Sequence, residues 1–214
     1  MDIEFSKLDI TQQDIPVWRV DVPSLKTFET PVLKESAWMI DDIDDDKIIN
    51  DYDYSPEQLR FWYDPNIGMY QEETKFIYEM FNTENIINHL DDLFSIKENY
   101  ELIDKLYQYN RHGSYSSFKE WIKDKVECEQ SIVKDVNGMK IYSHTDTRIY
   151  FGTFVINLKD NTSSTEFDIF GYGPKDKGTG IFFLNDISTK HSIEHVENDD
   201  RLILYNQIRF TVLD

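Results

Sequence analysis

The feature that most constrains the fold of this chain is a change of pattern near residue 130. Beyond it, seven short segments are rich in β-branched and aromatic residues and are separated by turn-forming residues. The segments are SIVKDV, MKIYSH, RIYFGTFVINL, STEFDIFGY, TGIFFL, HSIEHV and RLILYNQIRFTVL. Short strands at this spacing favour an antiparallel sandwich or barrel, so the sequence predicts a mainly β fold here.

The first 129 residues mix extended and helical patterns. Residues 15–40 carry three prolines, which lack a backbone donor, so we expect an edge or wrapping segment here and not a central strand. Apolar residues at helical spacing predict helices within 71–107 and again from residue 118, with Cys128 on the last helix as an inert thiol. We expect one domain over 1–214, an α+β fold whose helices (1–129) pack on one outer face of the β core (130–214).

The charge and the single cysteine exclude several classes of protein. There are 22 Lys and Arg against 41 Asp and Glu, a net charge of −19, which disfavours nucleic acid and anionic membranes as partners. One cysteine excludes an internal disulfide and any zinc site built mainly from thiolates. No apolar run approaches the roughly 20 residues that span a bilayer, and the N-terminus does not resemble a signal peptide. We therefore expect a cytoplasmic protein.

An acidic run over residues 41–53 contains seven Asp. Four of them, from Asp42 to Asp53, fall at positions 1, 3, 5 and 12 of a twelve-residue calcium loop. However, Lys47 stands where such a loop needs glycine for its sharp turn, and the last ligand is Asp instead of Glu. A solvated acidic loop is the preferred interpretation, and the sequence predicts no role for it.

The most specific chemical feature is the pair His144 and Asp146. In a strand, residues two apart point to the same face, so an imidazole and a carboxylate can meet at one point. One neutral and one anionic ligand suit a divalent metal such as iron(II). The third ligand would come from His191 or His195, the remaining histidines of the β half. Two His and one carboxylate on one face of an octahedral ion leave positions open for substrate and oxygen.

Taken in order, the motif His144-x-Asp146, the later His191 and Arg201 ten positions beyond it form an ordered set. This set resembles the signature of the 2-oxoglutarate- and iron(II)-dependent oxygenases, especially their prolyl-hydroxylase-like members. The resemblance covers residues 130–214 and implies a double-stranded β-helix, or jelly roll, as the core.

The resemblance also implies roles. His144, Asp146 and His191 would hold Fe(II), and 2-oxoglutarate and O2 would be cosubstrates. Arg201 would pair with the distal carboxylate of 2-oxoglutarate, because a planar guanidinium can hold a carboxylate through two parallel hydrogen bonds. The reaction would hydroxylate a peptidyl residue such as proline, or a small molecule, and release succinate and CO2. The sequence predicts neither the substrate nor the oligomeric state.

Several alternatives stay open at this point. His195 has the same strand parity as His191 and could be the distal ligand, although the spacing to Arg201 favours His191. Arg201 could instead be a surface residue paired with Asp199 or Asp200. The whole chain could be a non-catalytic jelly-roll binding module, or a cupin-like metalloenzyme that does not use 2-oxoglutarate.

Overall fold

A computed structural model describes residues 3–7, 15–30, 38–40, 60–63, 72–107, 117–122, 125–146, 149–169, 171–193 and 196–211. The acidic run 41–53 and His195 lie outside these described residues. The described part holds two antiparallel sheets and five α-helices, so the prediction of a mainly β, antiparallel fold is confirmed. No α-helix in the described ranges is long and apolar enough to cross a membrane.

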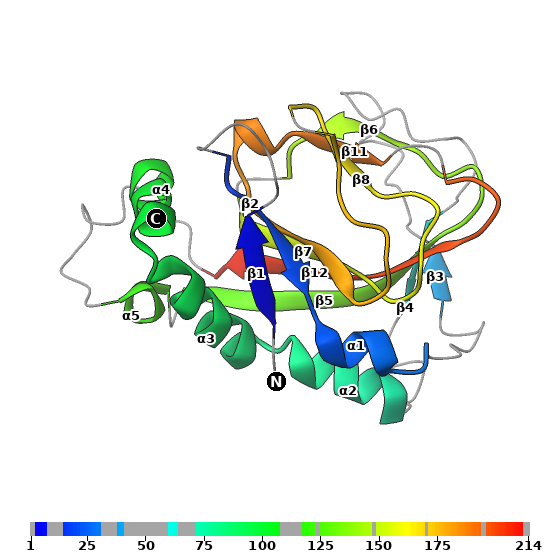
Figure 1. The fold of residues 1–214 in the computed structure, drawn as a ribbon, viewed down its shortest axis with the longest axis horizontal. Coiled ribbons are helices and arrows are strands. Elements are labelled where there is room, and N and C mark those ends of the chain that lie inside the picture. Colours follow the sequence, from blue (N-terminus) through cyan, green and yellow to red (C-terminus); the bar gives the residue numbers. More distant parts are fainter. Residues whose placement is uncertain are drawn as a thin grey trace.

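The larger sheet has eight strands in the order β1-β2-β10-β7-β12-β5-β4-β3. Their bounds are β1 (Glu4–Lys7), β2 (Val17–Asp21), β3 (Trp38–Ile40), β4 (Arg60–Tyr63), β5 (Val126–Asp135), β7 (Tyr150–Asn157), β10 (Thr179–Leu184) and β12 (Arg201–Phe210). The smaller sheet has the order β6-β11-β8-β9, with β6 (Ile141–His144), β8 (Thr165–Phe167), β9 (Gly171–Tyr172) and β11 (His191–Ile193). It lies over one face of the larger sheet. Helices of the first part of the chain lie along the other face, and the helix of residues 97–107 lies at the left-hand end (Figure 1).

Five helices come from the first part of the chain. They are α1 (Pro23–Thr27), α2 (Glu72–Met80), α3 (Thr83–Phe94), α4 (Lys97–Tyr107) and α5 (Phe118–Ile122). The side chain of Asn82 caps α3 by accepting a hydrogen bond from the backbone N–H of Asn85 at 2.9 Å. The apolar stripe of α3, with Ile86 and Leu90, joins Phe154 and Phe182 of the larger sheet in one buried core.

Strand alternation divides the larger sheet into two faces. On β7, Phe154 faces the helical core, whereas Val155 belongs to a second cluster shared with Phe167 of the smaller sheet. Val133 and Ile203 face this second cluster too. The odd-numbered positions of 133–135, 153–157, 181–183 and 201–205 therefore point into the space between the two sheets, which we call the interlayer.

Two expectations about the first part of the chain need correction. The edge prediction for segment 15–40 holds for β3, the last strand of the larger sheet, but is wrong for β2, which lies between β1 and β10. Its prolines, Pro16 and Pro23, flank β2 and leave the strand donors intact. Cys128 lies on β5 and not on a helix, because α5 ends at Ile122 and the apolar residues after it continue in strand alternation.

Candidate metal centre

Three side chains with metal-ligand atoms converge at one edge of the smaller sheet. His144 ends β6, Asp146 follows two residues later, and His191 begins β11. Since β6 and β11 are adjacent, His144 and His191 lie directly opposite each other in the strand register. One ligand atom from each of the three residues lies within 4.8 Å of the others. The structure thus brings together the three residues that the sequence analysis singled out.

The carboxylate lies between the two imidazoles. Oδ1 of Asp146 is 3.8 Å from Nε2 of His144 and 3.9 Å from Nε2 of His191. The two rings are tilted, with centroids 4.5 Å apart. A divalent ion placed among these three atoms could bond to all of them after small side-chain adjustments.

Backbone carbonyls orient both imidazoles. Nδ1 of His144 is 2.9 Å from the carbonyl oxygen of Tyr142, and Nδ1 of His191 is 3.0 Å from that of Thr189. A carbonyl can only accept, so each Nδ1 carries a proton, and in the neutral imidazole Nε2 then keeps its lone pair. This is the tautomer that a metal ligand requires.

Thr153 holds the carboxylate in turn. It is fully buried on β7, and its hydroxyl donates to Oδ2 of Asp146 at 2.8 Å. This bond occupies one oxygen of Asp146 and leaves the other directed at the imidazoles. A hydrogen bond of this kind behind a metal ligand fixes the ligand's orientation.

His191 lies on the buried side of the site. It is 5% exposed, and the rings of Phe167 and Phe183 lie 5.7 Å and 4.8 Å from its imidazole. Burial lowers the pKa of His191; Asp146 opposes this shift, and the charge of His144 adds to it. The His144 side chain is 20% exposed against 7% for His191, so solvent reaches the site from the His144 side.

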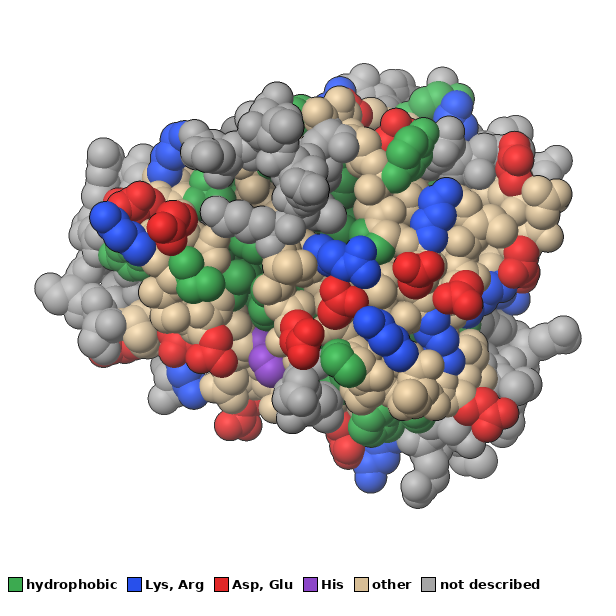
Figure 2. Space-filling view, viewed as in Figure 1, with side chains coloured by type: hydrophobic (Ala, Val, Ile, Leu, Met, Phe, Trp, Pro, Cys, Tyr) green, Lys and Arg blue, Asp and Glu red, His purple; other side chains and the backbone are tan. Residues whose placement is uncertain are grey.

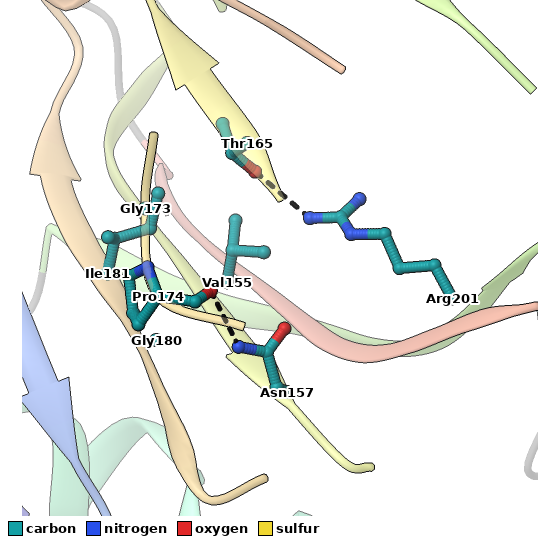
Figure 3. Close-up of a pocket in the computed structure, with 8 residues that line it drawn as sticks. All are labelled: Val155, Asn157, Thr165, Gly173, Pro174, Gly180, Ile181 and Arg201. Atoms are coloured by element: carbon teal, nitrogen blue, oxygen red, sulfur yellow. Dashed lines mark hydrogen bonds between the residues drawn. The ribbon is translucent and has the colours of Figure 1, made fainter. Parts of the chain in front are cut away.

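Arg201 lies elsewhere in the same interlayer. It is 1% exposed and borders a cavity of about 10 Å³ (Figure 3). Its Nη2 donates to Oγ1 of Thr165 at 3.0 Å, and its Nη1 to Oδ2 of Asp135 at 3.0 Å. Its Nε has no hydrogen-bond partner among the described residues. The other residues that line the cavity are Val155, Asn157, Gly173, Pro174, Gly180 and Ile181.

The alternative that Arg201 is a surface residue paired with Asp199 or Asp200 is therefore wrong. The odd-numbered face of β12 carries Arg201 into the interlayer, where Asp135 is its ionic partner. Asp199 pairs with Lys159 instead, on the exterior of the molecule.

Arg60 is a second arginine at this place, which the sequence analysis did not find. Its Nε and Nη2 donate to Oδ1 and Oδ2 of Asp135 at 2.7 Å and 3.0 Å, a two-pronged pair. Burial alone would raise the pKa of the wholly buried Asp135, but Arg60 and Arg201 hold it below its usual value. Asp135 is therefore an anion shared by two arginines.

Three residues of the site escaped sequence reasoning: Thr153, Asp135 and Arg60. Alternation places Thr153 on the face of Val155, which is a signal that it points inward but not that it meets Asp146. Asp135 is the last residue of β5 and Arg60 the first of β4, and a charged side chain at the end of a strand is ordinary. Their role becomes visible only when β4, β5 and β12 pair, because Asp135 then lies opposite both Arg60 and Arg201.

Charges of both signs cover the exterior. On the face shown in Figure 2, acidic and basic side chains of the described residues are interspersed. Among the described residues, acidic side chains also form ion pairs, for example Asp21 with Arg19 and Lys26. On this part of the surface, no single sign of charge dominates.

Comparison with known proteins gave structural similarities only. No family model and no curated protein matches the sequence. Solved structures that resemble this chain include two prolyl hydroxylases, a member of the 2OG-Fe(II) oxygenase family and a dioxygenase.

Three of these structures illustrate the range. A viral collagen prolyl hydroxylase from Paramecium bursaria Chlorella virus-1, in its 2-oxoglutarate complex, is 17% identical, with 70% of this chain and 77% of that chain covered and a TM-score of 0.41. A Pseudomonas putida prolyl-4-hydroxylase is 11% identical, with 73% and 77% covered and a TM-score of 0.41. A rice dioxygenase for auxin oxidation is 15% identical, with 92% and 74% covered and a TM-score of 0.49. Because all three scores are below 0.5, they carry no inference about chemistry.

Proposed function

We propose that this chain is an iron(II)- and 2-oxoglutarate-dependent oxygenase that hydroxylates a peptidyl residue or a small molecule, with succinate and CO2 as coproducts. The observation that supports this most is the convergence of two imidazoles and one carboxylate, all held by hydrogen bonds, beside an interlayer that contains a buried arginine. The two facing antiparallel sheets are consistent with a jelly-roll core whose metal lies between them.

The donor set fits a ferrous ion. An iron ion would take its three protein ligands on one face: Nε2 of His144, Nε2 of His191 and Oδ1 of Asp146. The opposite face of the ion would then stay open for other ligands. Bound there, the iron would supply oxygen activation and a chelating site for a 2-oxo acid. The protein contributes the ligand geometry, and Phe167 and Phe183 keep water from the His191 side.

Arg201 is suited to bind the distal carboxylate of 2-oxoglutarate. Its Nε has no partner among the described residues, although the side chain is fully buried, so a donor is available to an anion. Thr165 lies beside it and offers a hydroxyl. The adjoining cavity of about 10 Å³ has room for about one water molecule, so cosubstrate binding requires the two sheets to separate locally beside Arg201.

The decisive experiment is succinate formation from 2-oxoglutarate with added Fe(II), using the uncoupled turnover that needs no prime substrate. We expect succinate from the wild type and its loss in His144→Ala and in Arg201→Ala. Arg209→Ala is the matched control, because Arg209 lies at the other end of β12 and pairs with exposed Glu129. Unchanged succinate formation in His144→Ala would refute the ligand assignment.

The same assay separates the two alternatives. A cupin-like metalloenzyme would bind the metal through the same three residues but would leave 2-oxoglutarate unconsumed. A non-catalytic binding module would neither consume 2-oxoglutarate nor lose metal affinity in His144→Ala. Metal titrations run beside the succinate assay therefore distinguish all three functions.

A further inference from the structure

Arg60, Asp135 and Arg201 form a row across three neighbouring strands. In the strand register Asp135 of β5 lies directly opposite Arg201 of β12 on one side and Arg60 of β4 on the other. Residues directly opposite in an antiparallel pair share a face, so all three point into the interlayer. Their side chains are 12%, 0% and 1% exposed for Arg60, Asp135 and Arg201. One carboxylate thus serves two buried guanidinium groups, and the row carries one net positive charge.

The two arginines do not share Asp135 equally. Arg60 engages both of its oxygens, at 2.7 Å and 3.0 Å, whereas Arg201 reaches only Oδ2 through Nη1. An arginine that faced Asp135 alone could close a two-pronged pair and neutralise it. Arg60 already holds the carboxylate in that way, and the Nε of Arg201 finds no acceptor in the described part of the chain.

We infer that Arg60 is a positioning residue for anion binding: by engaging Asp135, it keeps the guanidinium of Arg201 available to the distal carboxylate of a dicarboxylate ligand. This inference rests on the proposed function and adds to it a residue from the N-terminal part of the chain. It also makes Asp135 the group that fixes the direction of Arg201.

A dicarboxylate 2-oxo acid has one carboxylate for each part of the site. A divalent ion held by Asp146 would keep one net positive charge and would favour the 2-oxo acid end of the ligand. Arg201 keeps an Nε that has no partner among the described residues, and this donor would favour the distal carboxylate. A monocarboxylate 2-oxo acid leaves that donor unpaired, so we expect the site to prefer a dicarboxylate.

The test is a double-mutant cycle in which the measured quantity is the affinity for 2-oxoglutarate and not the rate of turnover. Calorimetry measures the Kd of 2-oxoglutarate for Mn²⁺-loaded wild type, Arg60→Met, Asp135→Asn and the double variant, after melting curves show which of them fold. In Arg60→Met, Asp135 pairs fully with Arg201, so we expect 2-oxoglutarate to bind roughly tenfold more weakly or worse. The double variant removes both charges and leaves Arg201 free, so we expect its Kd to return to within about threefold of the wild type.

A recovery of this kind is not expected of a merely structural pair, for which the double variant would bind no better than Arg60→Met. Mn²⁺ affinity should be the same in all variants. Arg209→Met, on the same strand but paired with exposed Glu129, should leave the Kd unchanged. Arg60→Met alone leaves Asp135 and Arg201 as a matched buried pair, so it still tests the inference if the variants that remove Asp135, and leave Arg201 without a carboxylate, fail to fold.

Substrate selectivity supplies a second readout. Wild type should prefer 2-oxoglutarate over the monocarboxylate 2-oxobutyrate, and Arg60→Met should lose most of this preference. If wild type binds 2-oxoglutarate and Arg60→Met binds it equally well, this inference is overturned and the proposed function stands. If Mn²⁺-loaded wild type binds no 2-oxoglutarate, the proposed function fails and the inference fails with it.

Discussion

The hydroxyl of Thr153 donates to Oδ2 of Asp146 over 2.8 Å, while Oδ1 of the same carboxylate faces both imidazoles. Thr153 therefore fixes the orientation of the Asp146 carboxylate, although Thr153 is not itself a candidate metal ligand. Thr153→Val keeps the shape and removes the donor, so we expect metal affinity to fall about 10- to 100-fold. Titration with Mn²⁺ measures this effect directly.

Thr179→Val is the control for that substitution. Thr179 is equally buried, at the start of β10, and its hydroxyl donates to the carbonyl oxygen of Asp176 and not to a site residue. Its replacement should change the melting temperature but leave metal affinity as it is. Equal losses of affinity in the two variants would show that Thr153 acts through general packing.

The buried imidazole of His191 predicts a pH dependence for the metal-free protein. Its pKa is lowered in the folded state, mainly by burial, and returns to about 6.5 on unfolding. As the pH falls below about 6.5, the unfolded chain takes up a proton that the folded chain refuses, so stability decreases until the lowered pKa is reached. Denaturation in the presence of chelator should show this slope, and His191→Asn should reduce it. An identical slope in both proteins would contradict the assignment.

Gly180 is required by the close approach of two strands. A Cβ at this position would lie 2.1 Å from the carbonyl oxygen of Val155 and 2.8 Å from Cα of Ile156, which are backbone atoms that cannot move aside. We expect Gly180→Ala to cost about 3 kcal/mol, which corresponds to a fall of roughly 6–12 °C in Tm.

Gly171→Ala is the comparison for Gly180→Ala. Gly171 has a φ of +90°, but no heavy atom lies within 4 Å of the added Cβ. Only backbone strain opposes the change, about 1–2 kcal/mol, so its Tm should fall by less. A larger fall for Gly171→Ala would mean that β7 and β10 are further apart than the structure has them.

Cys128 should be unreactive until the protein unfolds. Burial on β5 raises the pKa of its thiol to about 12, so at pH 8 almost no thiolate is present. As the single cysteine, it gives one labelling rate per molecule. A thiol reagent at pH 8 should label native protein far more slowly than protein in denaturant, and comparable rates would contradict the packing of β5 under α3.

The sequence predicted the β part of the fold better than the rest. Each of the seven segments beyond residue 130 contains a strand, because alternation and turn residues act locally. The sequence pattern did not predict β4, a four-residue strand whose partner β5 begins more than sixty residues later. Gly180 lies in β10, within the predicted segment TGIFFL, but the sequence pattern does not show that the close approach of β7 requires a glycine there.

In the candidate site, too, local features could be predicted from the sequence, whereas contacts between distant segments could not. His144 and Asp146 are two apart on one strand and its continuation, so their convergence could be predicted from spacing. His191 and Arg201 came from the resemblance, and their roles stay predictions. Neither spacing nor the resemblance could identify Arg60. It meets Asp135 only because β4 pairs with β5, and these two strands are far apart in the sequence.

The most direct test of the central claim is anomalous diffraction from crystals soaked in Mn²⁺. The account predicts one strong peak bonded to Nε2 of His144, Nε2 of His191 and Oδ1 of Asp146, at roughly 2.0–2.2 Å from each, by analogy with zinc bonds to the same ligand types. A peak bound by other residues, or an interlayer without any peak at saturating Mn²⁺, would contradict it.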